Sequence, residues 1–227
     1  MIYVMSDIHG CYDKYKKMLE KISFSKEDTL YILGDVVDRG SHGMKVLLDI
    51  AKRENVILLR GNHDHQAGIL LSALDKLEDK NFQRELVEVY RIWLSDGGEK
   101  TLAEYLTLTE AEQETVLEVL RKSIISKEIE VNGKNFLLAH TVPEVDIICD
   151  YEEWKLEDFI LGEPDYEEVY FDEKYIVTGH TPTFYIDKTF NGKIWMKNHH
   201  IAIDCGAVFG NPLGCVCLDT LTEFYVL

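Results

Sequence analysis

The stretch Gly34–Gly40 carries two carboxylates and a guanidinium directly after an apolar run at 30–33 that predicts a buried strand. Side chains that leave the carboxyl end of a strand are where α/β proteins place their chemistry. Asp35, closest to the strand, could bridge two metal ions. Asp38 and Arg39 could reach a neighbouring group and an anion. The alternative is a solvated turn in which Asp38 and Arg39 form a salt bridge.

A second apolar run, residues 2–5, is followed by Asp7 and His9. Side chains two positions apart on an extended chain point to the same side. A carboxylate and an imidazole that face one point suit a borderline divalent metal such as Mn, Fe or Zn. Such pairs also occur by chance, so this pair alone is a weak signal.

A third predicted strand, at 56–59, is followed by Arg60, Asn62 and His63. Asn62 offers a neutral amide oxygen to a metal, and Arg60 could bind a phosphate through two N–H groups. His63 could relay a proton if Asp38 holds its other ring nitrogen, because a buried carboxylate orients and basifies an imidazole. The alternative is a solvent-facing turn.

Two later strand ends each deliver one histidine. Residues 136–139 precede His140, and residues 175–178 precede His180. A single histidine at a strand end is more often structural than a metal ligand, so the residues alone leave both roles open.

The elements that position these groups follow from hydrophobic spacing. Amphipathic helices over about 12–22 and 41–53 alternate with the first three strands. This order indicates a βαβαβ unit with right-handed crossovers and a mainly parallel sheet. A further helix is expected to begin near Gln66. Residues 66–131 are predicted to be a mostly helical insertion that walls or caps the site.

The rest of the chain predicts mostly strands. Asn132-Gly133 indicates a hairpin between strands at 128–131 and 135–139, and residues 141–174 are expected to be a surface loop with one short helix. The C-terminal part is expected to form a meander that makes a second sheet packed on the first, with strands at 184–186, 193–196, 201–204, 214–219 and 222–226.

Composition limits the classes of function. The 227 residues carry a formal net charge of −17, which disfavours general nucleic-acid binding and attachment to anionic membranes. Five cysteines at scattered spacings do not suggest a disulfide framework, and they favour a reducing cytoplasm. We find no signal peptide and no apolar run of the roughly 18 residues that a membrane span requires. We expect one domain over residues 1–227, located in the cytoplasm.

The combined motifs resemble those of the calcineurin-like metallophosphoesterase superfamily, in particular its phosphoprotein-phosphatase branch. That branch includes bacterial serine/threonine phosphatases and diadenosine tetraphosphate hydrolases. The motifs are Asp7-x-His9-Gly10, Gly34-Asp35-x-x-Asp38-Arg39-Gly40, Gly61-Asn62-His63-Asp64, His140 and Gly179-His180. The resemblance implies an α/β fold, a two-sheet β-sandwich flanked by helices with a helical insertion.

The resemblance also implies a centre with two divalent metal ions. Mn is favoured, and Fe, Zn, Co or Ni would also suit the ligands. Carried over position by position, the metal ligands are Asp7, His9, Asp35, Asn62, His140 and His180, with Asp35 bridging the two ions. The implied catalytic residues are His63, Asp38, Arg39 and Arg60, with Asp38 paired to His63 and the two arginines binding phosphate.

The expected activity is hydrolysis of a phosphoester. The leading hypothesis is a phosphatase acting on phosphomonoesters, such as phosphoserine or phosphothreonine in a protein. The second is a hydrolase of dinucleoside polyphosphates or other nucleotides, whose base could stack on an aromatic loop containing Tyr151, Trp154, Phe159 and Tyr166. The third is a metal-bound regulatory binding protein with little catalysis. Residues 141–179 contain no arginine, so Lys155 or Lys174 would have to supply any further cation there.

Overall fold

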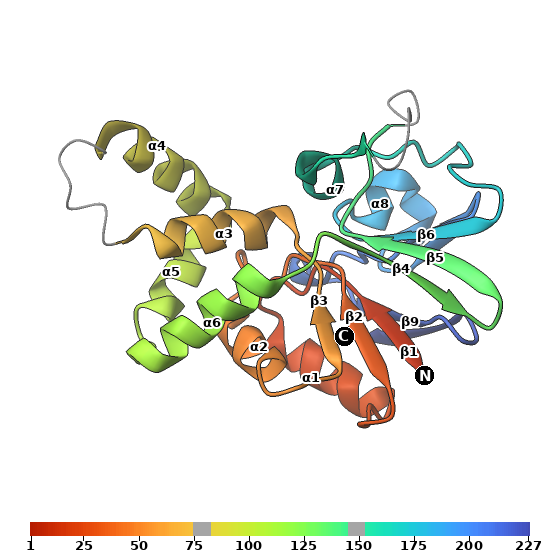
Figure 1. Ribbon diagram of the computed structural model, residues 1–227, viewed down its shortest axis with the longest axis horizontal. Coiled ribbons are helices and arrows are strands. Elements are labelled where there is room, and N and C mark those ends of the chain that lie inside the picture. Colours follow the sequence, from red (N-terminus) through yellow and green to blue (C-terminus); the bar gives the residue numbers. More distant parts are fainter. Residues whose placement is uncertain (75–82, 145–152) are drawn as a thin grey trace.

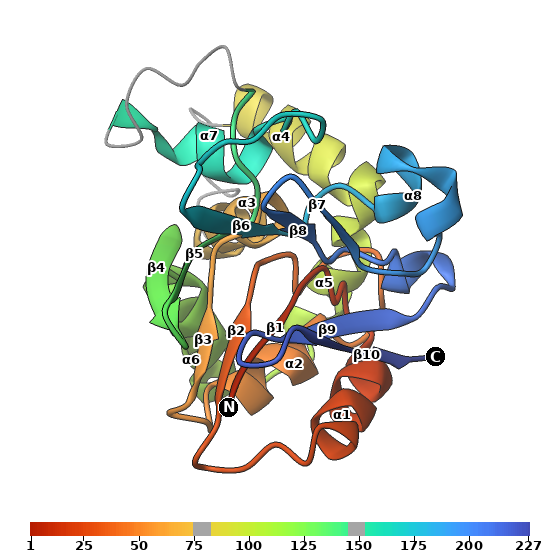
Figure 2. The ribbon, with the colours of Figure 1, turned by 90° about the vertical axis from the view of Figure 1, so that its right-hand side faces the viewer.

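Two five-stranded sheets lie face to face, with helices on the outer side of each (Figure 2). This arrangement is described by a computed structural model for residues 1–74, 83–144 and 153–227 (Figure 1). The predicted two-sheet sandwich flanked by helices is confirmed. Of the aromatic residues proposed to stack on a base, Tyr151 lies outside the described residues.

The first sheet contains the predicted βαβαβ unit. Strands β1 (Ile2–Met5), β2 (Thr29–Ile32) and β3 (Val56–Leu58) pair in parallel, and helices α1 (Tyr12–Lys21) and α2 (Gly43–Ile50) connect them. Helix α1 buries Tyr15, Met18 and Leu19 on one face, as its hydrophobic spacing predicts. The strand order is β10 (Thr222–Val226), β9 (Leu213–Cys217), β1 (Ile2–Met5), β2 (Thr29–Ile32) and β3 (Val56–Leu58).

The second sheet brings the two late histidines into the fold. Strands β5, β6 and β8 are parallel, so β5 and β6 end at the same edge, where His140 and His180 follow. The strand order is β4 (Ser126–Val131), β5 (Lys134–Ala139), β6 (Lys174–Thr178), β8 (His200–Ala202) and β7 (Trp195–Lys197).

The predicted C-terminal meander is wrong in two respects. Strands β9 and β10 join the first sheet, where β9 pairs antiparallel with β1, and only β7 and β8 join the second. Residues 184–186 belong to the short helix α8 (Thr183–Ile186) and not to a strand. Two aromatic residues there favoured a strand, but Pro182 at the N-cap fixes a backbone angle that suits the start of a helix.

The helices that follow β3 and precede β4 along the chain form the left-hand side of Figure 1. Helix α3 begins at Asn62, four residues before the predicted start, and helix α6 packs against α2 and α3. Helix α7 (Leu156–Leu161) lies by the second sheet. The helices on the left are α3 (Asn62–Ser72), α4 (Gln83–Trp93), a π-helical turn (Leu94–Gly98), α5 (Glu99–Tyr105) and α6 (Glu110–Lys122).

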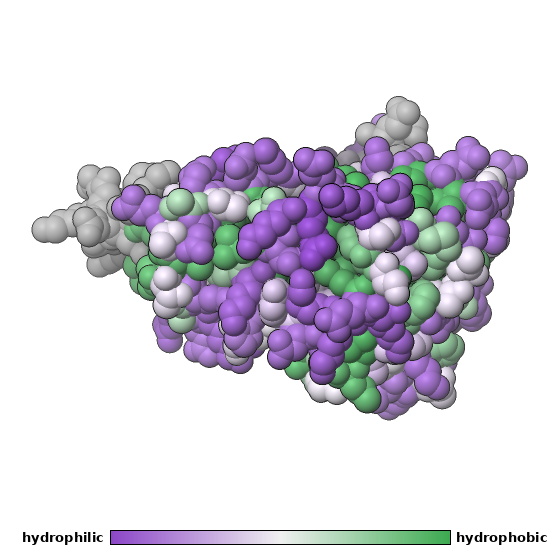
Figure 3. All heavy atoms as spheres, turned by 90° about the horizontal axis from the view of Figure 1, so that it is seen from below, coloured by the Kyte–Doolittle hydropathy of each residue, from purple (hydrophilic) through white to green (hydrophobic). Residues whose placement is uncertain are grey.

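The core between the sheets is made of side chains from both. Val4 and Leu33 from the first sheet pack with Phe136, Leu138 and Val177 from the second. A separate core lies between the first sheet and its helices. Hydrophilic residues dominate the face shown in Figure 3, with hydrophobic residues in small groups between them. Among the described residues, no helix has the length and apolar character to span a bilayer.

His200 is a buried histidine that provides a test of the second sheet. Its ring stacks on Tyr166 at a centroid distance of 4.9 Å, and its Nε2 lies 2.8 Å from Thr178 Oγ1. Burial lowers the pKa of His200 to about 3. The ring is therefore neutral in the folded chain, whereas in the unfolded chain it gains a proton below its ordinary pKa of about 6.5.

We expect the contribution of His200 to stability to be present above about pH 6.5 and to be lost as the pH falls toward 3. The loss should approach about 1.4 kcal/mol per pH unit. Urea unfolding of the wild type and of His200→Gln between pH 7.5 and 5 should show the wild type losing free energy of unfolding faster. His199→Gln, a change at the exposed neighbour, should follow the wild type. Parallel pH profiles for the wild type and His200→Gln would contradict this.

Candidate metal centre

The candidate site lies where strands from both sheets end. β1 leads to Asp7 and His9, and β2 leads to Asp35, while His140 and His180 follow strands of the second sheet. Backbone hydrogen bonds join the segments that follow β1 and β2. The Asp7 N–H donates to the Gly34 carbonyl at 3.1 Å, and the His9 N–H donates to the Asp35 carbonyl at 2.8 Å. The topology therefore brings the sequence-predicted strand ends together.

Left-handed backbone conformations are concentrated at this site. Non-glycine residues rarely adopt positive φ, and holding one there costs free energy. The candidate residues with φ between 42° and 67° are Asp7, His9, Asp35, Asp38, Arg39 and His180. The chain therefore accepts strain in order to turn these side chains and their N–H groups inward.

Close approach of backbone to ligand side chains requires glycine at two of the strand exits. A Cβ on Gly179 would lie 1.8 Å from Ser6 Oγ and 2.2 Å from Asp7 Oδ2. Gly34 has φ +88°, and a Cβ there would lie 2.8 Å from His140 Nδ1. Any larger residue would push the ligand side chains away.

One group of candidate ligands gathers around His140. The ring donates from Nδ1 to the Leu33 carbonyl at 2.6 Å, which leaves a lone pair on Nε2 when the ring is neutral. That nitrogen lies 3.0 Å from Asn62 Oδ1, 3.1 Å from His180 Nδ1 and 3.5 Å from Asp35 Oδ2.

Burial keeps both imidazoles of this group neutral. It lowers the pKa of His140, and together with the neighbouring His140 it lowers the pKa of His180 to about 3. The lone pair of His140 Nε2 therefore faces the amide oxygen of Asn62, which cannot donate to it, and the carboxyl group of Asp35. A divalent cation between these atoms is what this donor set fits.

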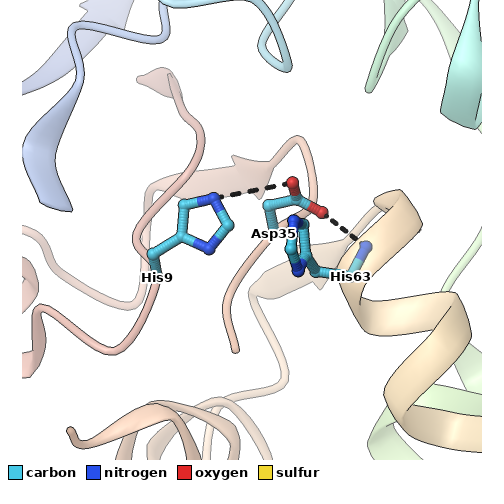
Figure 4. Close-up of side chains that lie close together, drawn as sticks. All are labelled: His9, Asp35 and His63. Atoms are coloured by element: carbon cyan, nitrogen blue, oxygen red, sulfur yellow. Dashed lines mark hydrogen bonds and ion pairs between the residues drawn. The ribbon is translucent and has the colours of Figure 1, made fainter. Parts of the chain in front are cut away.

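A second group contains His9, Asp35 and His63 (Figure 4). His9 Nδ1 donates to the Val37 carbonyl at 2.8 Å, so its Nε2 is free to face Asp35 Oδ2 at 3.6 Å. The other oxygen of Asp35 accepts the backbone N–H of His63 at 3.0 Å. A guanidinium N–H of Arg39 lies 3.1 Å from His9 Nε2. The lone pair of His9 Nε2 is thus already in contact with a positively charged side chain.

Asp7 adds buried negative charge beside both groups. Its Oδ2 accepts the His180 N–H at 2.9 Å and the hydroxyl of Ser6. Burial raises the pKa of Asp7, and burial together with Asp7 raises the pKa of Asp35 well above its usual range. A bound cation would favour the charged form of carboxyls buried this closely, which agrees with the facing lone pairs.

His63 is fixed by a buried carboxylate, as predicted. Its Nδ1 lies 2.7 Å from Asp38 Oδ2. The same oxygen accepts the indole N–H of Trp93 at 2.9 Å, and Asp38 Oδ1 accepts the Thr101 hydroxyl at 2.7 Å. On the other side of the ring, His63 Nε2 lies 3.8 Å from the half-exposed Asp96. Asp38 and its donors thus set the orientation of the imidazole.

A carboxylate–imidazole pair beside two metal-ligand groups at strand ends can catalyse metal-assisted hydrolysis, including that of phosphoesters. The family model of the calcineurin-like phosphoesterases matches residues 1–184.

The chain belongs to this family.

Two relatives show how far the similarity extends. This phosphoesterase is 28% identical to an asymmetrical bis(5'-nucleosyl)-tetraphosphatase of Bacillus velezensis, over 92% of this chain and 86% of the relative. It is 36% identical to a symmetrical bis(5'-nucleosyl)-tetraphosphatase of Wigglesworthia glossinidia brevipalpis over 37% of this chain. That match spans only 32% of the relative's length.

A solved structure supports the fold over the whole chain. A crystal structure assigned to a diadenosine tetraphosphatase matches this phosphoesterase with a TM-score of 0.66 at 19% identity. The match covers 99% of this chain and 92% of the other. At this identity the likeness establishes the fold and leaves the substrate open.

Arg60 does not join the cluster that the other predicted residues form. Its guanidinium donates to Ser123 Oγ at 2.9 Å and to the carbonyls of Arg121 and Ser123 at 3.1 and 3.0 Å. These partners lie at the end of helix α6, so Arg60 ties this helix to the exit of β3. Its Nε and one terminal nitrogen are thus bonded to this helix end, and phosphate binding by Arg60 stays a prediction.

Several residues that shape the site have no role in the sequence-based prediction. Asp64 accepts the backbone N–H groups of Asp35, Val36 and Gly61 at 2.8–3.2 Å and so fixes the loop after β2. Asp204 is a buried carboxylate near Asp7, and burial raises its pKa well above the usual range. Trp93 and Thr101 lie in the predicted helical insertion, and only the fold shows that they hold Asp38.

We expect Asp35→Asn to weaken Mn²⁺ binding by more than about 100-fold, because Asp35 faces both ligand groups. Without metal we expect Asp35→Asn to stabilise the fold, since the substitution removes one of several buried charges. In EDTA at pH 8, Asp35→Asn should melt about 2–4 °C above the wild type, the shift that about 1 kcal/mol gives in a chain of this size.

The two measurements are metal titration by calorimetry and thermal melting with EDTA or Mn²⁺. Asp187→Asn, which changes an exposed carboxylate in a turn, should match the wild type in metal binding. Unchanged metal affinity in Asp35→Asn would rule out a bridging position for this carboxylate.

Proposed function

We propose that this phosphoesterase is a two-metal hydrolase of dinucleoside polyphosphates, in which His63 protonates the leaving oxygen. The observation that carries the proposal is the buried Asp38–His63 pair, with 2.7 Å between its atoms, directly beside two groups of facing metal-ligand atoms. The first proposed metal has Asp7, His9 and Asp35 as ligands. The second has Asp35, Asn62, His140 and His180.

The role of His63 follows from its hydrogen bonds. Because Nδ1 is held by Asp38, the ring presents Nε2 as the atom that carries and donates a proton. Trp93 and Thr101 restrain Asp38, so the imidazole does not turn away. When bound, the two divalent ions supply an activated water and neutralise charge on the phosphoryl oxygens.

Arg39 is the proposed partner of the phosphate. Its guanidinium lies 3.1 Å from His9 Nε2 and 3.4 Å from the half-exposed Asp96, so it stands at the open side of the centre. A guanidinium there offsets the charge that develops on phosphoryl oxygens. Lys174, suggested as a further cation, bonds Glu128 at 2.5 Å near the start of β6 and does not suit this role.

The choice of substrate class is supported by relatives rather than by the centre itself. The Bacillus velezensis relative, aligned over nearly the whole chain, is named for a dinucleoside tetraphosphate. We therefore place this class before the phosphomonoesters that the motifs first suggested. The aromatic loop proposed to stack a base is less suitable, because Tyr166 stacks on the buried His200, and Trp154 packs on the buried Phe159 at 5.5 Å.

A comparison of substrates tests the class. Protein stripped of metal and reloaded with Mn²⁺ would receive diadenosine tetraphosphate, a phosphothreonine peptide and p-nitrophenyl phosphate side by side. We expect kcat/KM to be at least about 10-fold higher for the dinucleotide, and EDTA to abolish all activity. Preference for the peptide would assign a protein phosphatase. No hydrolysis of any substrate with metal bound would favour a regulatory binding protein.

His63→Ala tests the proton donor. Loss of general acid catalysis should lower kcat by about 10²- to 10⁴-fold while Mn²⁺ content stays unchanged. His65→Ala is the matched control, because His65 lies in the same helix and lines a pocket with Arg60 instead of facing Asp38. Near-normal kcat for His63→Ala would exclude the role, as would a loss of metal that accounts for the whole defect.

A further inference from the structure

Phe209 is a large aromatic residue that the fold leaves 57% exposed. It is the last residue of a short 3₁₀ turn, Ala207–Phe209, which follows β8 and precedes β9. Exposure of a single apolar side chain is ordinary on a protein surface. The position of this ring relative to the metal centre is what makes it informative.

Arg39 connects the ring to the centre. The Arg39 guanidinium carbon lies 5.9 Å from the centroid of Phe209, and an N–H of the same guanidinium lies 3.1 Å from His9 Nε2. Phe184 packs against Phe209 edge-to-face, with 6.3 Å between centroids. The ring is therefore supported by Phe184, stands beside the proposed phosphate-binding residue, and remains largely open to solvent.

The backbone that carries Phe209 is fixed in advance. Gly206 and Gly210 flank the turn with φ of 78° and 90°, which only glycine adopts easily. The Lys14 ammonium donates to the carbonyls of Ala207 and Asn211 at 2.9 and 2.6 Å, on either side of Phe209. The turn is thus held from helix α1, and the ring does not need to be ordered when a ligand arrives.

The turn is also joined to the metal centre itself. The Gly206 N–H donates to the buried carboxylate of Asp204 at 2.8 Å, and the N–H of the preceding Ile203 donates to the carbonyl of Thr178, two residues before His180, at 2.8 Å. The turn and the centre therefore share one rigid framework. A rigid ring at a fixed offset from a phosphate-binding arginine suits a ligand that has a planar group at a fixed distance from a phosphate.

We propose that Phe209 stacks on a nucleobase of the substrate while Arg39 binds the phosphate next to it. This assignment rests on the proposed function, since it places one end of a dinucleoside polyphosphate. Stacking uses the π-face that every base has, so it adds affinity without selecting one base. It also adds affinity that does not depend on charge, which suits a chain of net charge −17 that binds a polyanion.

The test compares a nucleotide with its phosphate part alone. ADP and inorganic pyrophosphate would be titrated by calorimetry into Mn²⁺-loaded His63→Ala protein, in which slow turnover favours a binding measurement. The ratio of the two affinities isolates the base, because a disturbance of Arg39 weakens both ligands. We expect this ratio to fall about 5- to 100-fold when Phe209→Ala or Phe209→Leu is added, and to be retained with Phe209→Trp.

The variants separate stacking from other effects. Leucine keeps an apolar contact with Phe184 but has no π-face, so a ratio retained by Phe209→Leu would overturn stacking. Tyr185→Leu is the matched control, because Tyr185 is 75% exposed and packs on Phe184 without a contact to Arg39. We expect it to leave the ratio unchanged, and an equal fall in this variant would show that Phe209 is not the base site.

The outcome is distinguishable from failure of the proposed function. A lower ratio in Phe209→Ala, with wild-type protein that does not hydrolyse diadenosine tetraphosphate, would keep the base site and reject the reaction. Hydrolysis of diadenosine tetraphosphate by the wild type, with an unchanged affinity ratio in Phe209→Ala, would keep the reaction and reject the base site. If Phe209→Ala weakens a phosphothreonine peptide but not ADP relative to pyrophosphate, the ring binds a peptide side chain and the nucleobase assignment is wrong.

Discussion

The site depends on holding several carboxyl groups inside the protein. Asp7, Asp35, Asp64 and Asp204 are each at most 4% exposed, and burial raises the pKa of every one. Backbone N–H groups from several strand exits donate to them. The left-handed backbone conformations serve the same purpose, because they turn N–H groups toward carboxyl oxygens that would otherwise lack hydrogen-bond donors. The loops are thus organised around buried carboxyl groups, and the proposed metal ions would offset their charge.

The helices beside the sandwich take part in the same arrangement. Trp93 ends α4 and Thr101 lies in α5, and both donate to Asp38. The π-helical turn between them brings the Gly97 carbonyl oxygen to 3.1 Å from the backbone nitrogen of Arg39, which donates to it. A Cβ on Gly97 would lie 2.6 Å from that nitrogen. Hydrogen bonds to a buried charge are worth about 1.5–3 kcal/mol each. These helices therefore position the proposed proton donor and do more than cover the centre.

The parts that sequence predicted well are those decided by local order. A polar group directly after an apolar strand must lie at the strand's end, so Asp35 and His140 could be placed without knowing their neighbours. The sequence could not show where the Arg60 side chain points, because its partner Ser123 is 63 residues away. Hydrophobic spacing also cannot decide which sheet a strand joins. β9 is buried along its whole length, and only its pairing with β1 assigns it to the first sheet.

The remaining physical question is how an acidic chain attracts an anionic substrate. At long range a net charge of −17 repels a polyphosphate, so attraction has to be local. Arg39 is the guanidinium that the described contacts place at the centre, and it is shared between His9, Asp96 and the ring of Phe209. A phosphate that replaces these partners would bind a guanidinium whose position is already restrained. Affinity should then rest on bound metal, on Arg39 and on contacts that carry no charge. An exposed aromatic ring next to that arginine supplies such a contact where a nucleotide needs it.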